Sequence, residues 1–286
     1  ETDVIAAHAK TFIGASAKAG EPFFAYVAPR APHSPATPAS RDKHAYDGLK
    51  APRPPSFNEK NVSDKPPWIR KLPRLSGAKK TRIDNRAEKR TETLQALDDL
   101  VAGIVSRLNE RRVLSKTYIF FTSDNGWHGG EHRIPQEKWR PYEEDVHMPL
   151  LVRGPGVAAG QQAHKLVLDT DYLPTFTDLA DVHTPNYVDG RSLQPVLEGD
   201  ATAWRSAILL EAAGSYSPAY RGIRTSDGRK YVEYAGGKRE LYNLGRDPYE
   251  LRDSYDPKSP PASLAKRLKK LRSCAAASCL AAENGQ

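Results

Sequence analysis

The sequence contains no run of about 18 apolar residues, so we expect no segment of it to span a membrane. The chain opens with ETDVIAAHAK, without an initiating methionine, a basic and apolar leader or a small-residue cleavage site. We therefore expect no secretion signal within it and expect that it begins inside a longer protein. No internal repeat is present.

Cysteine is scarce, since Cys274 and Cys279 are the only two in the chain. The four intervening residues allow a small disulfide loop, which we favour over free thiols, and two thiols without a further ligand nearby make a poor zinc site. Asn61 begins an Asn-Val-Ser triplet that could accept a glycan. Together these features favour an oxidising compartment.

Acidic residues are fewer than basic ones, with 35 Asp and Glu against 43 Lys and Arg. The excess is local, because residues 65–90 hold ten basic residues and two acidic ones. A solvated basic loop and an anionic partner both explain this segment. No recognised nucleic-acid module accompanies the charge, so nucleic acid is not the expected partner.

Hydrophobic periodicity predicts an α/β fold in the first 200 residues. We expect a helix over residues 3–19, a short buried strand over 22–29 and a proline-rich excursion from 29 to about 75. A second helix is predicted over 87–109, with Leu94, Leu97, Val101, Ile104 and Leu108 as its apolar stripe and with Asp98 and Asp99 on its polar side.

Further strands are predicted around 117–122 and 148–153, and again from Lys165 up to a helix cap at Thr170 or Asp171. Helices that alternate with buried strands indicate a layered α/β sheet. Beyond residue 200 the pattern changes to an antiparallel meander with a turn at Asp227-Gly228, followed by a lysine-rich helix. We therefore expect a main domain over 1–200 and a small α+β subdomain over 201–286.

The predicted strand that contains IFFT is followed, after Ser123, by Asp124 and Asn125. Ligands of layered α/β sheets collect at the C-terminal ends of strands. A carboxylate and an amide carbonyl are hard oxygen ligands suited to calcium or magnesium. An Asx turn that closes the strand is the simpler alternative.

The loop after this strand adds His132, Arg133 and Lys138. A lysine near a divalent cation fits a multiply charged oxyanion, although a surface lysine explains Lys138 when it is taken alone. Upstream, prolines flank His33, and this limits the freedom of an imidazole that could protonate a leaving oxygen. A loop histidine without a function is the alternative for His33.

The combined pattern resembles the sulfatase family of the alkaline phosphatase superfamily, most of all its N-acetylglucosamine-6-sulfatase-like members. The segments FFAYVAPRAPHSPATPA, YIFFTSDNGWHGGEHR, KWRPYEEDVHMPLLVRGPG, DYLPTFTDLADV and ELYNLGRDPYEL occur in the family's order. This resemblance implies the alkaline-phosphatase-like layered sheet with helices on both faces. It also implies a sulfated sugar or an aryl sulfate as the substrate, and a secreted, periplasmic or lysosomal location.

The resemblance also implies roles for single residues. Asp124 and Asn125 would bind one calcium ion, His33 and Lys138 would contact the sulfate group, and His132 would line the substrate pocket. His33 would further assist departure of the alcohol oxygen.

The sequence departs from the family in one respect that bears on activity. The family's formylglycine arises in a Cys/Ser-x-Pro-x-Arg motif, and no such pentapeptide occurs in this chain. We expect that motif and the remaining metal ligands in a missing N-terminal part, and expect this chain alone to be inactive. One alternative is a phosphodiesterase or phosphonate hydrolase of the same superfamily, and Asn125 argues against it. The other alternative is a noncatalytic protein that binds sulfated glycans.

Overall fold

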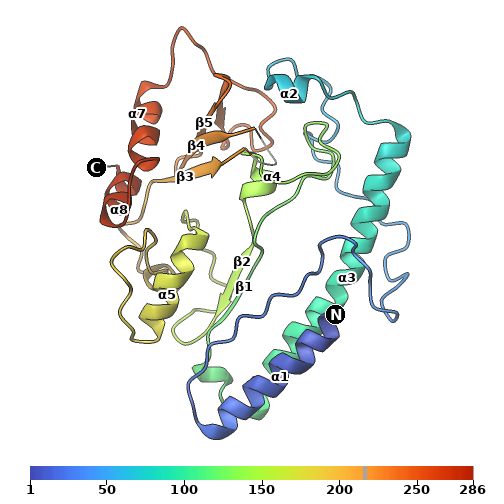
Figure 1. Cartoon of the computed structure of the whole chain (residues 1–286), viewed down its shortest axis with the longest axis vertical. Helices are drawn as coiled ribbons and strands as arrows, with labels where there is room; N and C mark the ends of the chain where they lie inside the picture. The colour runs from blue at the N-terminus through green and yellow to red at the C-terminus, as the bar shows by residue number, and fades with distance from the viewer. Residues whose placement is uncertain (215–217, 286) are drawn as a thin grey trace. The chain divides into compact units, whose positions relative to one another are not determined.

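The first predicted helix is α1 (Thr2–Ala19), which ends where Gly20 adopts a left-handed conformation with φ 73°. The computed structural model describes residues 1–214 and 218–285. These residues form two units. The first comprises Glu1–Arg53, Leu75–Ile119 and Arg153–Pro155, and the second comprises Pro54–Arg74, Phe120–Val152 and Gly156–Gln286. Figure 1 shows the course of the chain.

In the first unit, α1 packs against the long helix α3 (Gly77–Glu110), which is followed by the 3₁₀ turn η1 (Leu114–Lys116). The helix α3 begins ten residues before the predicted start at Ala87, because the Ser76 hydroxyl accepts a hydrogen bond from the Lys79 amide and caps it. Much of the basic 65–90 segment is therefore helical rather than a loop.

Two predictions about the first unit are wrong in detail. Residues 22–29 form no strand, and Phe24 and Tyr26 are 65% and 84% exposed. A strand needs a neighbour for its backbone hydrogen bonds, and no β-bridge joins this segment to the described part of the chain. In α3, Leu94 of the predicted stripe is exposed and Leu108 is buried as predicted, while the buried row also includes Ala96 and Leu100, which the stripe left out.

In the second unit, the strands predicted around the candidate ligands are β1 (Ile119–Thr122) and β2 (Leu150–Arg153). They pair in a two-stranded sheet, and Ile119 and Arg153 at their ends belong to the first unit. The proline-rich excursion contains only the short helix α2 (Pro67–Arg70). A further short helix, α4 (Glu143–Val146), precedes β2.

The strand predicted from Lys165 does not form, because its backbone groups bond to side chains instead of to a neighbouring strand. The Leu166 carbonyl accepts a hydrogen bond from Trp204 Nε1 at 2.7 Å, and the Leu168 amide donates to Asp171 Oδ2 at 2.8 Å. Asp171 does occupy the N-cap position of the predicted helix. In chain order, the elements here are η2 (Asp169–Asp171), α5 (Tyr172–Leu179) and α6 (Gln194–Leu197).

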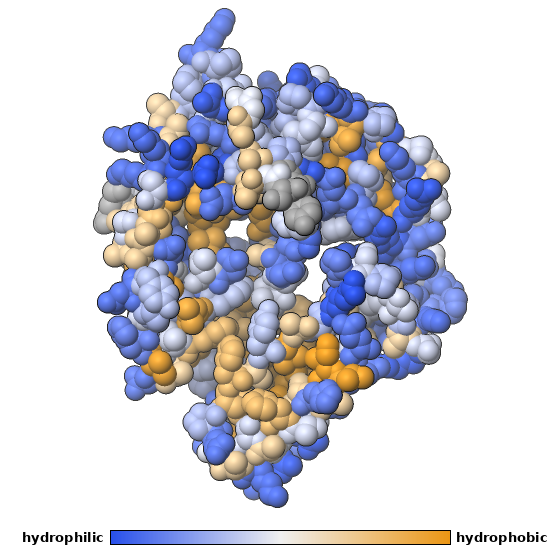
Figure 2. All heavy atoms as spheres, in the orientation of Figure 1, coloured by the Kyte–Doolittle hydropathy of each residue, from blue (hydrophilic) through white to orange (hydrophobic). Residues whose placement is uncertain are grey.

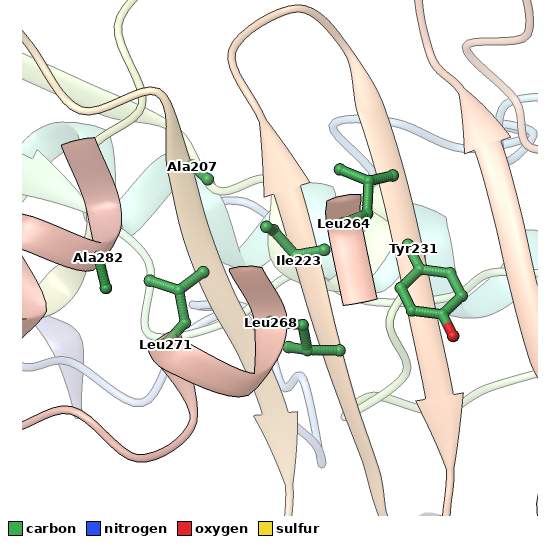
Figure 3. Close-up of a cluster of buried hydrophobic side chains, with 7 residues drawn as sticks. All are labelled: Ala207, Ile223, Tyr231, Leu264, Leu268, Leu271 and Ala282. Atoms are coloured by element: carbon green, nitrogen blue, oxygen red, sulfur yellow. The ribbon is translucent and has the colours of Figure 1, made fainter. Parts of the chain in front are cut away.

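The C-terminal meander is confirmed as a four-stranded antiparallel sheet in the order β3-β4-β5-β6. Its strands are β3 (Ala207–Ala212), β4 (Tyr220–Thr225), β5 (Arg229–Tyr234) and β6 (Arg239–Asn243). The lysine-rich helix α7 (Ala262–Leu271) packs on β3 and β4, and α8 (Ala277–Asn284) follows it. Figure 3 shows Leu264, Leu268 and Leu271 of α7 meeting Ile223 and Tyr231 in the core between them.

The cysteine pair is a disulfide, as predicted, which joins Cys274, just after α7, to Cys279 in α8. At the surface of the second unit, Phe121 of β1 and Leu151 of β2 are 36% and 60% exposed. Figure 2 shows apolar side chains on the face that it draws. Among the described residues, no helix has the length and apolar character needed to cross a membrane.

Candidate functional site

Asp124 and Asn125 follow β1, and the turn after them fixes their backbone. The Ser123 hydroxyl donates to the Asn125 carbonyl at 2.8 Å, and the Gly126 amide donates to the Asp145 carbonyl at 2.9 Å. Asp124 is exposed, while Asn125 is half-buried and its side-chain amide donates to the Gly126 carbonyl. This arrangement leaves the Asn125 Oδ1 atom as an acceptor.

Lys138 meets that acceptor. Its Nζ atom donates a hydrogen bond to Asn125 Oδ1 at 3.0 Å, and it also lies 5.0 Å from the ring centroid of Trp139. The structure therefore brings together two of the residues selected from the sequence, although 12 residues separate them along the chain. A cation therefore lies beside one of the oxygen atoms that could hold a metal.

A closed loop produces this contact. The His128 amide donates to the Glu137 carbonyl at 2.9 Å, and the Trp127 amide donates to the Glu144 carbonyl at 2.7 Å. These bonds fold residues 126–138 back on themselves and carry Lys138 to the end of β1. Positive φ values at His132, Arg133 and Trp139 provide the tight turns.

A buried histidine and carboxylate stabilise this loop, and neither was predicted from the sequence. His128 is fully buried, and its Nδ1 atom lies 2.8 Å from Asp145 Oδ1, while the other Asp145 oxygen accepts from the Arg140 amide at 2.8 Å. Burial lowers the pKa of His128, but the hydrogen bond and charge of Asp145 outweigh it and raise the pKa. No sequence pattern connects these two residues, because their spacing of 17 follows neither helical nor strand periodicity.

His132 lies inside the second unit. Its side chain is fully buried, its Nδ1 atom lies 2.8 Å from Glu59 Oε2, and its ring packs 4.4 Å from that of Tyr142. Burial lowers the pKa of His132 well below its usual value, so the imidazole is neutral, and burial raises the pKa of Glu59 to about 7. Its place in a substrate pocket stays a prediction.

The neighbouring Arg133 has a structural role. Its guanidinium donates to the carbonyls of Glu59, Lys60 and Leu72 at 2.9, 2.7 and 3.1 Å. These bonds attach the proline-rich segment to the loop that carries Lys138.

His33 belongs to the first unit, whereas the other candidate site residues belong to the second. Its side chain is exposed, and its Nδ1 atom lies 3.0 Å from the Ser34 carbonyl oxygen. Cis peptide bonds precede Pro32 and Pro35 on either side of it. Its predicted contact with sulfate stays a prediction.

The residues at the end of β1 fit a hard cation in kind. Asp124 offers a solvent-accessible carboxylate and Asn125 an amide oxygen, and calcium takes about six to eight such ligands. A different group of carboxylates lies in the described part of the first unit. One side-chain oxygen from each of Asp47, Glu88 and Glu92 lies within 4.8 Å of the other two. Backbone amides of Gly48 and His44 donate to Glu88 and Glu92, so this group caps a turn and we assign it no metal.

Gly130 in the loop provides a test of its packing. Its φ is 117°, and a Cβ atom there would lie 2.3 Å from Phe57 Cε2. We expect Gly130→Ala to destabilise the protein by about 1–3 kcal/mol more than Gly237→Ala, because overpacking adds to backbone strain. Gly237 is the matched control, since its φ is 83° and a Cβ atom there would meet no other atom within 4 Å. Denaturant unfolding of both variants measures this, and equal losses would contradict the packing.

Comparison with known proteins decides the family. Residues 1–182 match the family model described as Sulfatase, and residues 130–275 match that of N-sulphoglucosamine sulphohydrolase, C-terminal. The N-acetylglucosamine-6-sulfatase of Bos taurus is 33% identical over 97% of this chain and 56% of its own length. The chain belongs to the sulfatase family. The human N-acetylglucosamine-6-sulfatase is also 33% identical, over 91% of this chain and 54% of its own length.

The sulfatase chain described here thus spans about half the length of the curated relatives it matches. Solved structures agree on the fold. A protein in complex with its substrate D-glucosamine-2-N,6-O-disulfate aligns with a TM-score of 0.78 and 24% identity, over 95% of this chain and 69% of that one. The phosphonate monoester hydrolase of Agrobacterium radiobacter aligns with a TM-score of 0.58 and 26% identity, over 66% of this chain and 42% of that one.

Proposed function

We propose that this chain is the C-terminal portion of a sulfatase that hydrolyses sulfate esters of sulfated sugars. The hydrogen bond from Lys138 Nζ to Asn125 Oδ1 carries the proposal, because it joins a cation to one of the two candidate metal ligands at the end of β1. The curated relatives named N-acetylglucosamine-6-sulfatase support a sugar substrate. In the whole protein we expect the layered sheet with helices on both faces, and a boundary near residue 200.

The residues of this chain would share the work as follows. Asp124 and Asn125 would hold calcium, whose positive charge stabilises a sulfate group when it is bound. The formylglycine of the family would supply the nucleophile from the part of the protein outside this chain. Lys138 would bind a sulfate oxygen, because an ammonium group stabilises negative charge that develops as the ester bond breaks. His33 would donate a proton to the departing sugar oxygen.

The location follows from the same proposal. The Cys274–Cys279 disulfide fits an oxidising compartment, so we propose a secreted, periplasmic or lysosomal protein.

Assays of the full-length protein with N-acetylglucosamine 6-sulfate, an aryl sulfate and a phosphodiester test the function. We expect calcium-dependent release of sulfate, and a preference for the phosphodiester would overturn the proposal. That second candidate has support in the structural similarity to a phosphonate monoester hydrolase. Binding of sulfated glycans without hydrolysis would instead favour a noncatalytic protein.

A further inference from the structure

An open cleft of about 710 Å³ lies within the second unit, lined by the proline-rich segment and the turn after β6. Its lining includes Lys60 and Arg74 from the segment, and Arg252 from the turn. A smaller cavity of about 280 Å³ shares Asp64 and Asp253 with it. The volume of the cleft lies within the range of small-ligand pockets.

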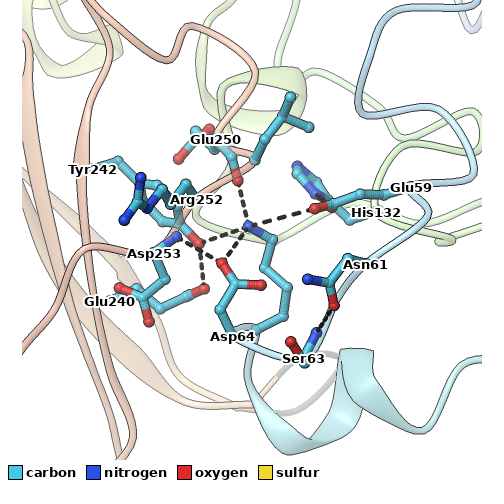
Figure 4. A network of polar contacts seen from close by, with 12 residues as sticks. Glu59, Asn61, Ser63, Asp64, His132, Glu240, Tyr242, Glu250, Arg252 and Asp253 are labelled. Atoms are coloured by element: carbon cyan, nitrogen blue, oxygen red, sulfur yellow. Dashed lines mark hydrogen bonds and ion pairs between the residues drawn. The ribbon is translucent and has the colours of Figure 1, made fainter.

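The acidic groups of the cleft are already paired with internal cations. The fully buried Lys65 Nζ lies 4.0 Å from Glu59 Oε1 and 3.5 Å from Asp64 Oδ2. Asp253 accepts from Lys238 Nζ at 2.7 Å. Figure 4 shows the side chains of Glu59 and Asp64 pointing toward the same ammonium group, which is that of Lys65. These carboxylates therefore oppose an anionic ligand less than their number suggests.

The basic groups of the cleft have no such partners. Lys60, Arg74 and Arg252 are exposed, and none of their side chains pairs with a carboxylate in the part of the chain that the structure describes. The cleft thus presents three cations that form no ion pair of their own among the described residues. A guanidinium group can donate two parallel hydrogen bonds to two oxygens of an oxyanion, which suits sulfate.

Hydrogen bonds also join the wall of the cleft to the loop that carries Lys138. Arg133 donates to the carbonyls of Glu59 and Lys60, and Arg133 belongs to the loop that ends at Lys138. Phe57 and Leu251 supply apolar surface in the same cleft, against which the carbon face of a sugar ring can pack. Cations and apolar surface together match a sulfated sugar better than inorganic sulfate.

We propose that this cleft binds a sulfated segment of a polymeric glycan, outside the sugar unit whose ester is cleaved. The inference rests on the proposed function and names the substrate as an oligomer rather than a single sugar. The cleft holds the neighbouring sulfate groups, and the site at the end of β1 acts on the terminal one. It is a binding site and takes no part in breaking the ester bond.

The test compares two double variants of the full-length protein that lose the same charge. Arg74→Gln with Arg252→Gln removes cations from the cleft, and Lys266→Gln with Lys269→Gln removes exposed cations from α7. Calorimetry measures binding of a heparin-derived octasaccharide at about 0.15 M salt, so that distant charges are screened. We expect about tenfold weaker binding for the cleft variant and less than about twofold for the control, since two charge-assisted contacts are lost.

Kinetics supply a second readout. The cleft variant should raise KM for the octasaccharide while kcat and the hydrolysis of a monosaccharide sulfate stay unchanged. Unaltered octasaccharide binding, or an equal loss in the α7 variant, would overturn the proposal. Equal competition by single-stranded DNA of the same charge would also overturn it, because the cleft would then recognise charge alone. If the full-length protein hydrolyses no sulfate ester, the proposed function fails, while the binding comparison still decides the role of the cleft.

Discussion

Replacing Lys138 with alanine in the full-length protein should lower kcat for a sulfate ester by about 100- to 1,000-fold, the range found when one group that stabilises transition-state charge is removed. Lys138 Nζ lies 3.0 Å from Asn125 Oδ1, so its charge is located where the sulfate oxygens would meet the metal ligands. The loss should appear mainly in kcat, because the ammonium group acts on charge that develops during the reaction. Steady-state kinetics with an aryl sulfate measures it.

A matched lysine controls for the change of charge. Lys266 is an exposed lysine on α7, and Lys266→Ala should leave kcat within about twofold of the wild type, because a single exposed charge is screened by salt. Lys138 is half-buried, so the thermal midpoint of the Lys138→Ala variant is measured as well. An unchanged kcat for Lys138→Ala in a folded protein would remove Lys138 from the active site.

The sequence predicted those elements whose local pattern and tertiary packing agree. The helix at 3–19, the strands beside Asp124 and Leu150, the meander and the disulfide all form. Apolar residues alternate or recur in each of these segments, and turn residues separate them. The strand predicted over 22–29 fails although its residues suit a strand, because composition does not supply a neighbouring strand for its backbone hydrogen bonds.

The same distinction holds within the candidate site. Asp124, Asn125 and Lys138 were selected because their chemistry is unusual after an apolar strand, and the structure joins Lys138 to Asn125. The pairs that support the loop, His128 with Asp145 and His132 with Glu59, bring together residues 17 and 73 positions apart. Contacts of that kind depend on the folded chain, so inspection of neighbouring residues could not predict them.

Asp171→Asn should have the largest effect on stability, a loss of about 3–5 kcal/mol, because it breaks a buried ion pair from one side. Asp171 and Arg205 are both fully buried, and the guanidinium donates to both carboxylate oxygens at 2.6 Å. The amides of Leu168 and Arg191 donate to the same two oxygens. Asparagine would keep one acceptor oxygen but turn an NH₂ group toward donors, and it would leave the charge of Arg205 to its ion pair with Glu283 at 2.9 Å. Thermal unfolding of the full-length protein should show a midpoint lower by on the order of 10 °C.

Asp169→Asn, two residues away at an exposed position, should cost less than about 1 kcal/mol, and a similar loss in both variants would contradict a dominant role for the buried pair.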